Sequence, residues 1–380
     1  MANNNENKVL NVPPLRFPEF SGVWKKCTIN DLATVVGGGT PDTTVKSYWG
    51  GDIQWFTPSE IGKNKYVDFS LRTITRDGLD NSSAKLLPLH TILLSSRATV
   101  GECSIASNEC TTNQGFQSLI AKQCNIDFLY YLIQTKKKDL IRNACGSTFL
   151  EISANEIRKI KVAVPVQNEQ EQIAKLLSLV DERIATQNKI IEKYESLING
   201  INCKIFASIQ GSEYRLGDIA TITNGNSNVQ DASTEYRIGF YPFFDRSEEI
   251  KYLPTFLFDK ESIIYPGEGT EFTPRYFNGK FAVHQRCYAI FDFKEVVNPK
   301  FVYFFLKTQN SYFIRNAVGS TVPSLRLDTF QKLKVVIPLP EIQHSVSSFL
   351  SVLEQKLDVE NNVIKKFLWQ KQYLLRQMFI

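Results

Sequence analysis

Apolar residues follow a heptad pattern along two long stretches of the chain. In the first stretch, residues 165–202, the apolar positions are Ile173, Leu177, Val180, Ile184, Ile191, Tyr194, Ile198 and Ile201. Steps of three, four and seven residues place these side chains on one helix face, which the polar Gln187 interrupts once. The pattern predicts a long helix that needs a partner to cover its apolar stripe, because helix propensity alone does not hold such a segment.

The second stretch, residues 338–380, repeats the pattern. Its apolar positions are Val346, Leu350, Leu353, Leu357, Ile364, Phe367 and Leu374, and Glu360 takes the polar place of Gln187. The two predicted helices are therefore candidates to cover each other. The alternative is two ordinary amphipathic helices, each packed on its own domain core.

These helices belong to a larger internal repeat. Gly146-Ser147-Thr148 matches Gly319-Ser320-Thr321, and at the same spacing Pro165 matches Pro338. Further upstream, the segment beginning at Asp31 matches the segment beginning at Asp218 at a larger spacing, so the first half has the longer middle. Repeated ends with divergent middles favour two similar scaffolds that hold two different reading surfaces.

The pattern predicts an α+β chain with repeated domains. We expect a flexible polar leader over residues 1–14, a first α/β domain over 15–164 and a central heptad helix over 165–202. A second α/β domain over 203–337 and a C-terminal heptad helix over 338–380 complete the predicted order.

Composition narrows the class of protein only mildly. The chain has 380 residues, enough for two domains, and a net charge of +5, which permits a nucleic-acid partner without requiring one. The seven cysteines are scattered and include no Cys-x-x-Cys pair, which fits a reducing cytoplasm better than a disulfide framework or a zinc ribbon. No apolar run has the length of a membrane span, so we expect a cytoplasmic protein.

Catalytic motifs are not recognisable in the chain. Its three histidines, His90, His284 and His344, have no second ligand at metal-binding spacing. The glycines of residues 37–39 lack the Gly-Lys-Ser/Thr continuation of a phosphate loop, so a mobile loop is favoured there. The basic run of residues 136–138 is either solvated or close to phosphate. The sequence therefore predicts no cofactor, metal or catalytic site in this chain.

Three stretches together resemble the specificity subunit of type I restriction-modification enzymes. They are Leu15-Arg16-Phe17-Pro18-Glu19-Phe20, Ser95-Ser96-Arg97-Ala98-Thr99-Val100-Gly101 with Asn113-Gln114-Gly115-Phe116 behind it, and Val164-Pro165 followed by Glu169-Gln170-Glu171-Gln172-Ile173. The resemblance covers the chain from Leu15 onward. The second half departs from it, because His344-Ser345 stands for a Glu-Gln pair and only His284-Gln285-Arg286 lies near the Asn-Gln position.

This resemblance implies a fold and a set of partners. Two target recognition domains would each read one half of a split sequence in double-stranded DNA. The long helices would form an antiparallel coiled coil that separates the domains and docks two methyltransferase subunits. S-adenosylmethionine would bind those subunits, and ATP and Mg would bind two motor-nuclease subunits, which leaves no cofactor in this chain.

The residues expected to contact DNA lie in polar loops of both domains. They are Thr40, Thr57, Ser59, Ser96, Arg97 and Gln114 in the first domain, and Asn224, Asn226, Arg246, Thr270, Arg275 and Arg286 in the second. Two alternatives stay open: a subunit, or half of one, from another methyltransferase or restriction assembly, and a coiled-coil scaffold with no sequence preference.

Overall fold

The chain forms two compact units in the computed structural model, which describes residues 11–146, 150–319 and 321–380. The first unit contains the chain up to Asn188 together with Val363–Ile380, and the second contains Lys189–Asn362. Both long helices therefore contribute to both units. The predicted boundary between residues 202 and 203 falls inside one of these helices.

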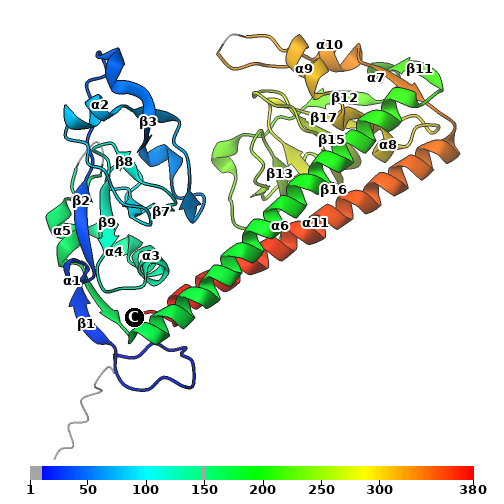
Figure 1. The fold of residues 1–380 in the computed structure, drawn as a ribbon. Helices are drawn as coiled ribbons and strands as arrows, with labels where there is room; N and C mark the ends of the chain where they lie inside the picture. Colours follow the sequence, from blue (N-terminus) through cyan, green and yellow to red (C-terminus); the bar gives the residue numbers. More distant parts are fainter. Residues whose placement is uncertain (1–10, 147–149, 320) are drawn as a thin grey trace, which may run out of the picture. The chain divides into compact units, whose positions relative to one another are not determined.

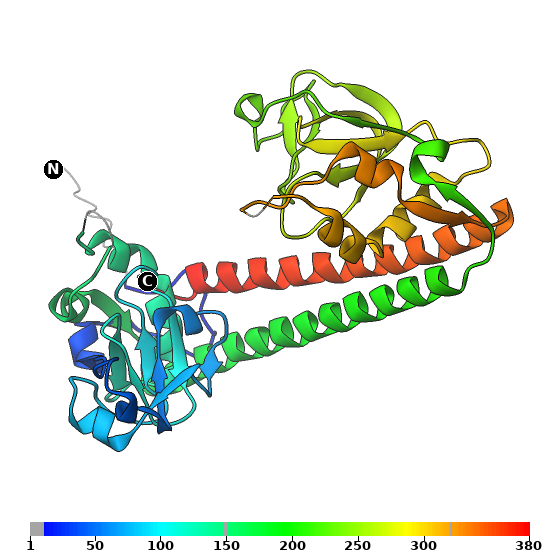
Figure 2. The ribbon, with the colours of Figure 1, turned by 90° about the horizontal axis from the view of Figure 1, so that it is seen from above.

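The two predicted long helices are present. Helix α6 spans Gln167–Ser208 and helix α11 spans Pro340–Gln377. In the first unit the beginning of α6 lies beside the end of α11, and in the second unit the end of α6 lies beside the beginning of α11 (Figures 1 and 2). In each unit the two helix segments run in opposite directions, as an antiparallel coiled coil requires.

The prediction that the central helix ends near residue 202 was wrong. A side chain at Gly200 would meet no atom within 4 Å, so the helix continues there without a steric cause to stop. Beyond it, the Asn202 amide donates to the carbonyl of Phe304 at 3.0 Å, and Phe206 packs on Phe301 with ring centroids 5.1 Å apart. These contacts within the second unit hold the last helical turns in place.

The first unit contains three sheets. Strands β2, β9, β6, β7 and β4 form a five-stranded sheet in that order, β5-β3-β8 a three-stranded sheet, and β1 pairs with β10. The strand bounds are β1 Lys25–Thr28, β2 Ala33–Gly37, β3 Trp49–Phe56, β4 Tyr66–Val67, β5 Arg72–Ile74, β6 Ile92–Leu94, β7 Cys103–Ala106, β8 Cys110–Thr112, β9 Gln117–Ala121 and β10 Lys161–Val164. Its helices are α1 Ile29–Leu32, α2 Arg76–Asp80, α3 Ile126–Thr135, α4 Lys137–Arg142, α5 Ala154–Lys159, and the 3-10 turns η1 Lys46–Tyr48 and η2 Pro58–Glu60.

The second unit has one larger sheet, in the order β12-β17-β15-β16-β13-β14, and a β11-β18 pair. The strands are β11 Ser212–Arg215, β12 Thr221–Asn224, β13 Tyr241–Phe244, β14 Lys251–Leu253, β15 Phe258–Pro266, β16 Arg275–Val283, β17 Cys287–Phe291 and β18 Lys334–Ile337. The helices are α7 Leu216–Ile219, η3 Val229–Asp231, α8 Pro299–Lys307, α9 Asn310–Asn316 and α10 Leu327–Gln331.

The long helices are part of each core. In the first unit Leu177 on α6 and Leu375 on α11 join one buried cluster with Phe128 of α3. Residues 1–10 of the predicted leader lie outside the described part of the chain. The remainder is not a flexible tail, because the backbone of Asn11 accepts a hydrogen bond from the Trp24 amide at 2.8 Å. The Asn11 side chain in turn donates to the Trp24 carbonyl at 2.6 Å.

Candidate nucleic-acid interface

A polar turn, residues 113–115 between β8 and β9, is the centre of the first candidate surface. Its Asn113 amide donates to the carbonyl of Phe56 at 3.0 Å, next to the predicted Thr57. The carbonyl of Gly115 accepts from the amide of Ser96 at 2.8 Å. The Gln114 side chain accepts a hydrogen bond from the Thr40 hydroxyl. The turn thus brings together segments that carry all six residues predicted for this domain.

Thr57 and Ser59 play different roles on this surface. Thr57 caps η2: its amide and its hydroxyl both donate to Glu60 Oε2, at 2.7 and 2.6 Å. Ser59 is exposed, and its hydroxyl lies 3.0 Å from that of Thr57. The Thr57 hydroxyl proton is engaged by Glu60, so Ser59 has the more available group for a ligand.

Ser96 and Arg97 occupy opposite environments. Ser96 is fully buried, and its hydroxyl has no hydrogen-bond partner among the described residues. The side chain therefore does not reach the surface that the other five residues share. Arg97 is about half exposed and lies 3.8 Å from a carboxylate oxygen of Glu151, a separation that leaves its guanidinium available to phosphate.

Gly37 is the last residue of β2, and Gly38 and Gly39 are closely packed, so the structure does not show the mobile loop that the sequence predicted. A Cβ atom on Gly38 would lie 2.0 Å from the Asn113 carbonyl oxygen. The second unit has the same requirement at Gly225, where a Cβ would lie 1.9 Å from the carbonyl oxygen of Val283. In both units, glycine lets the loop after the first strand of the main sheet lie against the polar turn.

The second unit repeats this arrangement around residues 284–286, between β16 and β17. The carbonyl of Gln285 accepts from the Asn224 side chain at 3.3 Å. The carbonyl of Arg286 accepts from the amide of Gly267 at 3.0 Å, as that of Gly115 does from Ser96 in the first unit. The backbone contacts are equivalent and the middle residue is glutamine in both turns, but the residues on either side of it differ.

The predicted residues of the second unit fall into two groups. Arg286 is paired with Glu268, whose oxygens lie 2.8 and 3.0 Å from one guanidinium nitrogen, and Arg275 donates to the carbonyl of Ser247. Asn224, Asn226, Arg246 and Thr270 are exposed, and of these Asn224 donates to the carbonyl of Gln285. Arg286 is also exposed, although it is paired. Arg246 is next to Ser247 in the chain, so it lies close to Arg275.

Burial and charged neighbours shift the pKa values of two groups on this surface, His284 and Asp245. Burial lowers the pKa of His284; Asp245 and Glu268 oppose that shift, and Arg286 and Arg246 add to it. Burial acts to raise the pKa of Asp245, but hydrogen bonds from Lys251, 2.6 Å away, and from the Ser247 hydroxyl outweigh it and lower that pKa. A neutral imidazole beside an ionised carboxylate is therefore the expected state near neutral pH.

Sequence comparison matches most of the chain to one family model. The model for the type I restriction modification DNA specificity domain matches twice, over residues 22–196 and 211–367. The chain belongs to the type I restriction-modification DNA specificity family. The two matched segments correspond to the two halves of the internal repeat.

Relatives support this family assignment over nearly the full length. The MjaIX specificity subunit of Methanocaldococcus jannaschii is 30% identical, and the alignment covers 88% of this chain and 87% of the relative. The EcoR124I/EcoR124II specificity subunit of Escherichia coli is 29% identical over 44% of this chain and 43% of its own length. The crystal structure of an S subunit from M. genitalium has the same fold, with a TM-score of 0.61, 19% identity and coverage of 97% of this chain and 99% of the other.

The structure locates a segment in this specificity-family chain that sequence reasoning missed. No Ser-Ser-Arg copy is visible in the second half, but Gly267-Glu268 takes that place. The carbonyl of Gly267 accepts a hydrogen bond from the backbone amide of Leu325 at 2.7 Å. In the first unit, the carbonyl of Ser96 accepts from the backbone amide of Ile152 at 2.9 Å. Leu325 and Ile152 have the same spacing as the repeat, which was the available clue. The charge is inverted, because Glu268 stands where Arg97 stands in the first unit.

In each unit a buried glutamine near the beginning of one long helix bonds two backbone groups, and we call this set of bonds the joint. In the first unit the Gln170 amide donates to the carbonyl of Pro165 at 3.0 Å, and its oxygen accepts from the Asn125 amide at 3.0 Å. In the second unit the Gln343 amide donates to the carbonyl of Pro338 at 2.9 Å, and its oxygen accepts from the Asn298 amide at 2.8 Å. The His344-Ser345 departure therefore leaves the residue that forms these bonds unchanged.

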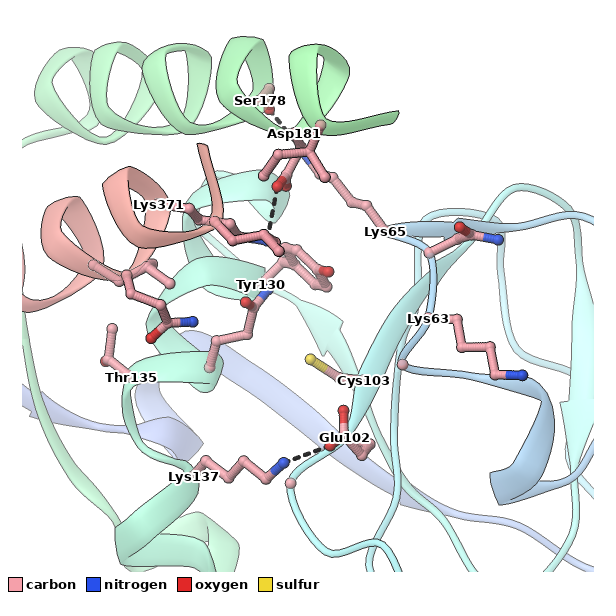
Figure 3. Close-up of a pocket in the computed structure, with 18 of the residues that line it drawn as sticks. Lys63, Lys65, Glu102, Cys103, Tyr130, Thr135, Lys137, Ser178, Asp181 and Lys371 are labelled. Atoms are coloured by element: carbon pink, nitrogen blue, oxygen red, sulfur yellow. Dashed lines mark hydrogen bonds and ion pairs between the residues drawn. The ribbon is translucent and has the colours of Figure 1, made fainter. Parts of the chain in front are cut away.

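The first unit also has a groove of about 1150 Å³ between α3, α4, the two long helices and the segments that carry Lys65 and Glu102 (Figure 3). Lys65 donates to Ser178 of α6 at 2.6 Å, and Lys371 of α11 pairs with Asp181 at 2.7 Å. Of the basic run, Lys137 pairs with Glu102 and Lys136 donates to the carbonyl of Ile380 at 2.9 Å. Most lysines of this groove therefore bind the protein itself.

The described residues also show neither a metal site nor a membrane-spanning helix. They contain no group of three or more His, Cys, Asp or Glu side chains placed to hold a metal ion. No helix among them combines the length and apolar character that a bilayer crossing needs.

Proposed function

We propose that this chain is the non-catalytic subunit that reads the DNA sequence in a type I restriction-modification complex. Each unit would read one half of a bipartite target in double-stranded DNA. The observation that supports this most is the repeated polar turn, at residues 113–115 and 284–286. Its backbone contacts are the same in both units and its middle residue is glutamine in each, but the flanking side chains differ: Asn113 and Gly115 in the first unit, His284 and Arg286 in the second. A scaffold without sequence preference would have no need of two different surfaces.

The exposed groups suit the two tasks of DNA recognition. Guanidinium groups such as that of Arg97 bind phosphates and set the register of the protein on the duplex. Amide side chains such as those of Gln114 and Asn226 present donors and acceptors that match base edges in the major groove. Arg246 can serve either purpose.

The chemistry of modification and cleavage would come from partner subunits. Two methyltransferase subunits, with S-adenosylmethionine, would dock on the paired helices, and two motor-nuclease subunits would supply ATP-driven movement and Mg-dependent cleavage. One solved structure with this fold, at a TM-score of 0.57 and 12% identity, comes from work on the complex assembly and conformational transition of the type I R-M system. We expect the complex to act in the cytoplasm.

The direct test compares the methylomes of cells with and without this chain, in the presence of the methyltransferase subunit. The proposal predicts that a split sequence motif loses methylation when the chain is deleted. A gel-shift series with random and motif-bearing duplexes, with and without the methyltransferase subunit, then measures sequence preference. Equal affinity for all duplexes would favour a scaffold, and methylation by the isolated chain would show that it is an enzyme.

A further inference from the structure

Two apolar side chains protrude from the first unit beside its candidate DNA surface. Phe69 is 80% exposed and Leu71 is 88% exposed, and they flank Ser70 in the short loop between β4 and β5. We call residues 68–71 the apolar loop. Single exposed apolar residues are common on proteins, so exposure alone does not mark a site.

The backbone of the apolar loop is fixed. The Ser70 amide donates to Gln54 Oε1 at 2.7 Å, and the Ser70 hydroxyl accepts from the Trp55 amide at 2.8 Å. The Leu71 amide donates to Glu60 Oε1 at 2.6 Å. These hydrogen bonds at successive residues hold Phe69 and Leu71 outward, so their exposure is not the result of a frayed segment.

The same contacts place the loop next to the predicted DNA-binding residues. Glu60, which receives the Leu71 amide through one oxygen, receives the amide and hydroxyl of Thr57 through the other. A single carboxylate therefore connects the apolar loop to the Thr57–Ser59 segment.

A second connection leads to Thr40 through the two tryptophans. The guanidinium of Arg72, the residue after the loop, lies 3.6 Å from the ring centre of Trp49, which packs edge-on against Trp55 at 5.0 Å. Trp55 Nε1 donates to the carbonyl of Gly39 at 2.9 Å, beside Thr40. Arg72 remains exposed and adds positive charge at the base of the apolar loop.

We propose that Phe69 and Leu71 are specificity-determining residues that contact the bases of the half-site read by the first unit. This inference rests on the proposed function. Duplex DNA offers apolar partners in thymine methyl groups and in the faces of partly unstacked bases. The adjacent arginine and hydroxyl groups suit a polyanion that surrounds such apolar contacts, which favours DNA over a protein partner for this loop.

The test uses the full chain assembled with the methyltransferase subunit and a duplex that carries its methylated motif. The double variant Phe69→Ala/Leu71→Ala should weaken binding by roughly tenfold or more, because two apolar side chains lose their burial. The matched control is Leu89→Ala, which removes an apolar side chain that is 51% exposed in another loop of the same unit. Thermal unfolding of each variant verifies the fold.

The salt dependence of binding separates apolar contacts from phosphate contacts. An apolar contact releases no counterions, so the double variant should keep the wild-type slope of log affinity against log salt. Discrimination should fall for bases of one half-site only. Unchanged affinity and discrimination, a reduced slope, or loss of methyltransferase binding would each overturn the inference. If the wild-type complex itself shows no preference for the motif, the proposed function fails instead.

Discussion

The two units use the same joint but differ beside it. Gln170 and Gln343 make matching bonds. Phe128 stacks on Phe379 with ring centroids 5.2 Å apart, and Phe301 packs at a tilt against Phe206 at 5.1 Å. Next to the joint the units diverge. In the first, the fully buried Glu169 side chain binds Arg16 through two oxygens, each at 2.7 Å. In the second, the residue at the position of Glu169 is Ile342, which is 44% exposed.

This difference shows what the repeat retains. The glutamine bonds two backbone groups, so the same side chain is needed wherever that backbone geometry recurs. The Glu169 ion pair holds a segment that only the first unit has, since Arg16 precedes the first strand. Equivalent backbone contacts are therefore the shared framework, and side chains around them are free to diverge between the units.

The largest expected effect is confined to the first unit. Glu169→Ala leaves the Arg16 guanidinium, which is 13% exposed, with backbone carbonyls but no carboxylate to neutralise it, and should cost about 3 kcal/mol or more of unfolding free energy. Ile342→Ala, the matched change in the second unit, should cost less than about 0.5 kcal/mol. Urea unfolding with hydrogen exchange resolved for each unit measures both. Similar losses for the two variants would contradict the asymmetry of the joints.

Replacing Gln170 or Gln343 is expected to lower stability by an intermediate amount that is similar in the two units. Gln170→Leu and Gln343→Leu each leave a partly buried backbone amide and a buried carbonyl without this partner, at a cost of about 2 kcal/mol in the affected unit. Gln172→Leu, at an exposed position of α6, is the control. The same unfolding measurement applies, and a marked difference between the two buried variants would argue against an equivalent joint.

The smallest expected effect is a dependence of the stability of the second unit on pH. Burial lowers the pKa of His284 below its usual value of 6.5, so the unfolded chain takes up this proton first as pH falls. The second unit should therefore lose stability as pH drops below about 6.5, with no contribution from this group well above that pH. His284→Asn, which places an Asn there as in the turn of the first unit, should reduce the loss. Gln285→Asn is the control, and unfolding midpoints at pH 7.5 and 5.5 give the comparison. An equal loss in the His284→Asn variant would rule out this histidine as the cause.

The sequence predicted the architecture well because the signals were repeated and local. The heptads of α6 and α11 and the matched joints depend on side-chain types at fixed spacing, and both could be recognised. The end of α6 was misplaced at residue 202, just after Gly200, because packing against α8 outweighs the weak helix propensity of that glycine. The helix continues for six residues beyond the predicted end.

The candidate sites were only partly predictable. Loops carrying Thr40, Thr57 and Gln114 were chosen for composition, and the structure brings them together through backbone contacts that sequence alone does not reveal. Ser96 is buried, and Gly267-Glu268 was missed because the middles of the two halves differ in length. The role of Gly38 became apparent only from the carbonyl packed against it.

The central claim is that each unit reads its own half of the target. Replacing residues 212–337 with the matching segment of another family member tests it most directly, when followed by methylome sequencing in the presence of the methyltransferase subunit. The exchanged segment keeps the β11–β18 pair together with the surface it supports. We predict a methylated motif in which one half changes and the half read by the first unit stays the same. A motif in which both halves change, or neither does, would contradict the account.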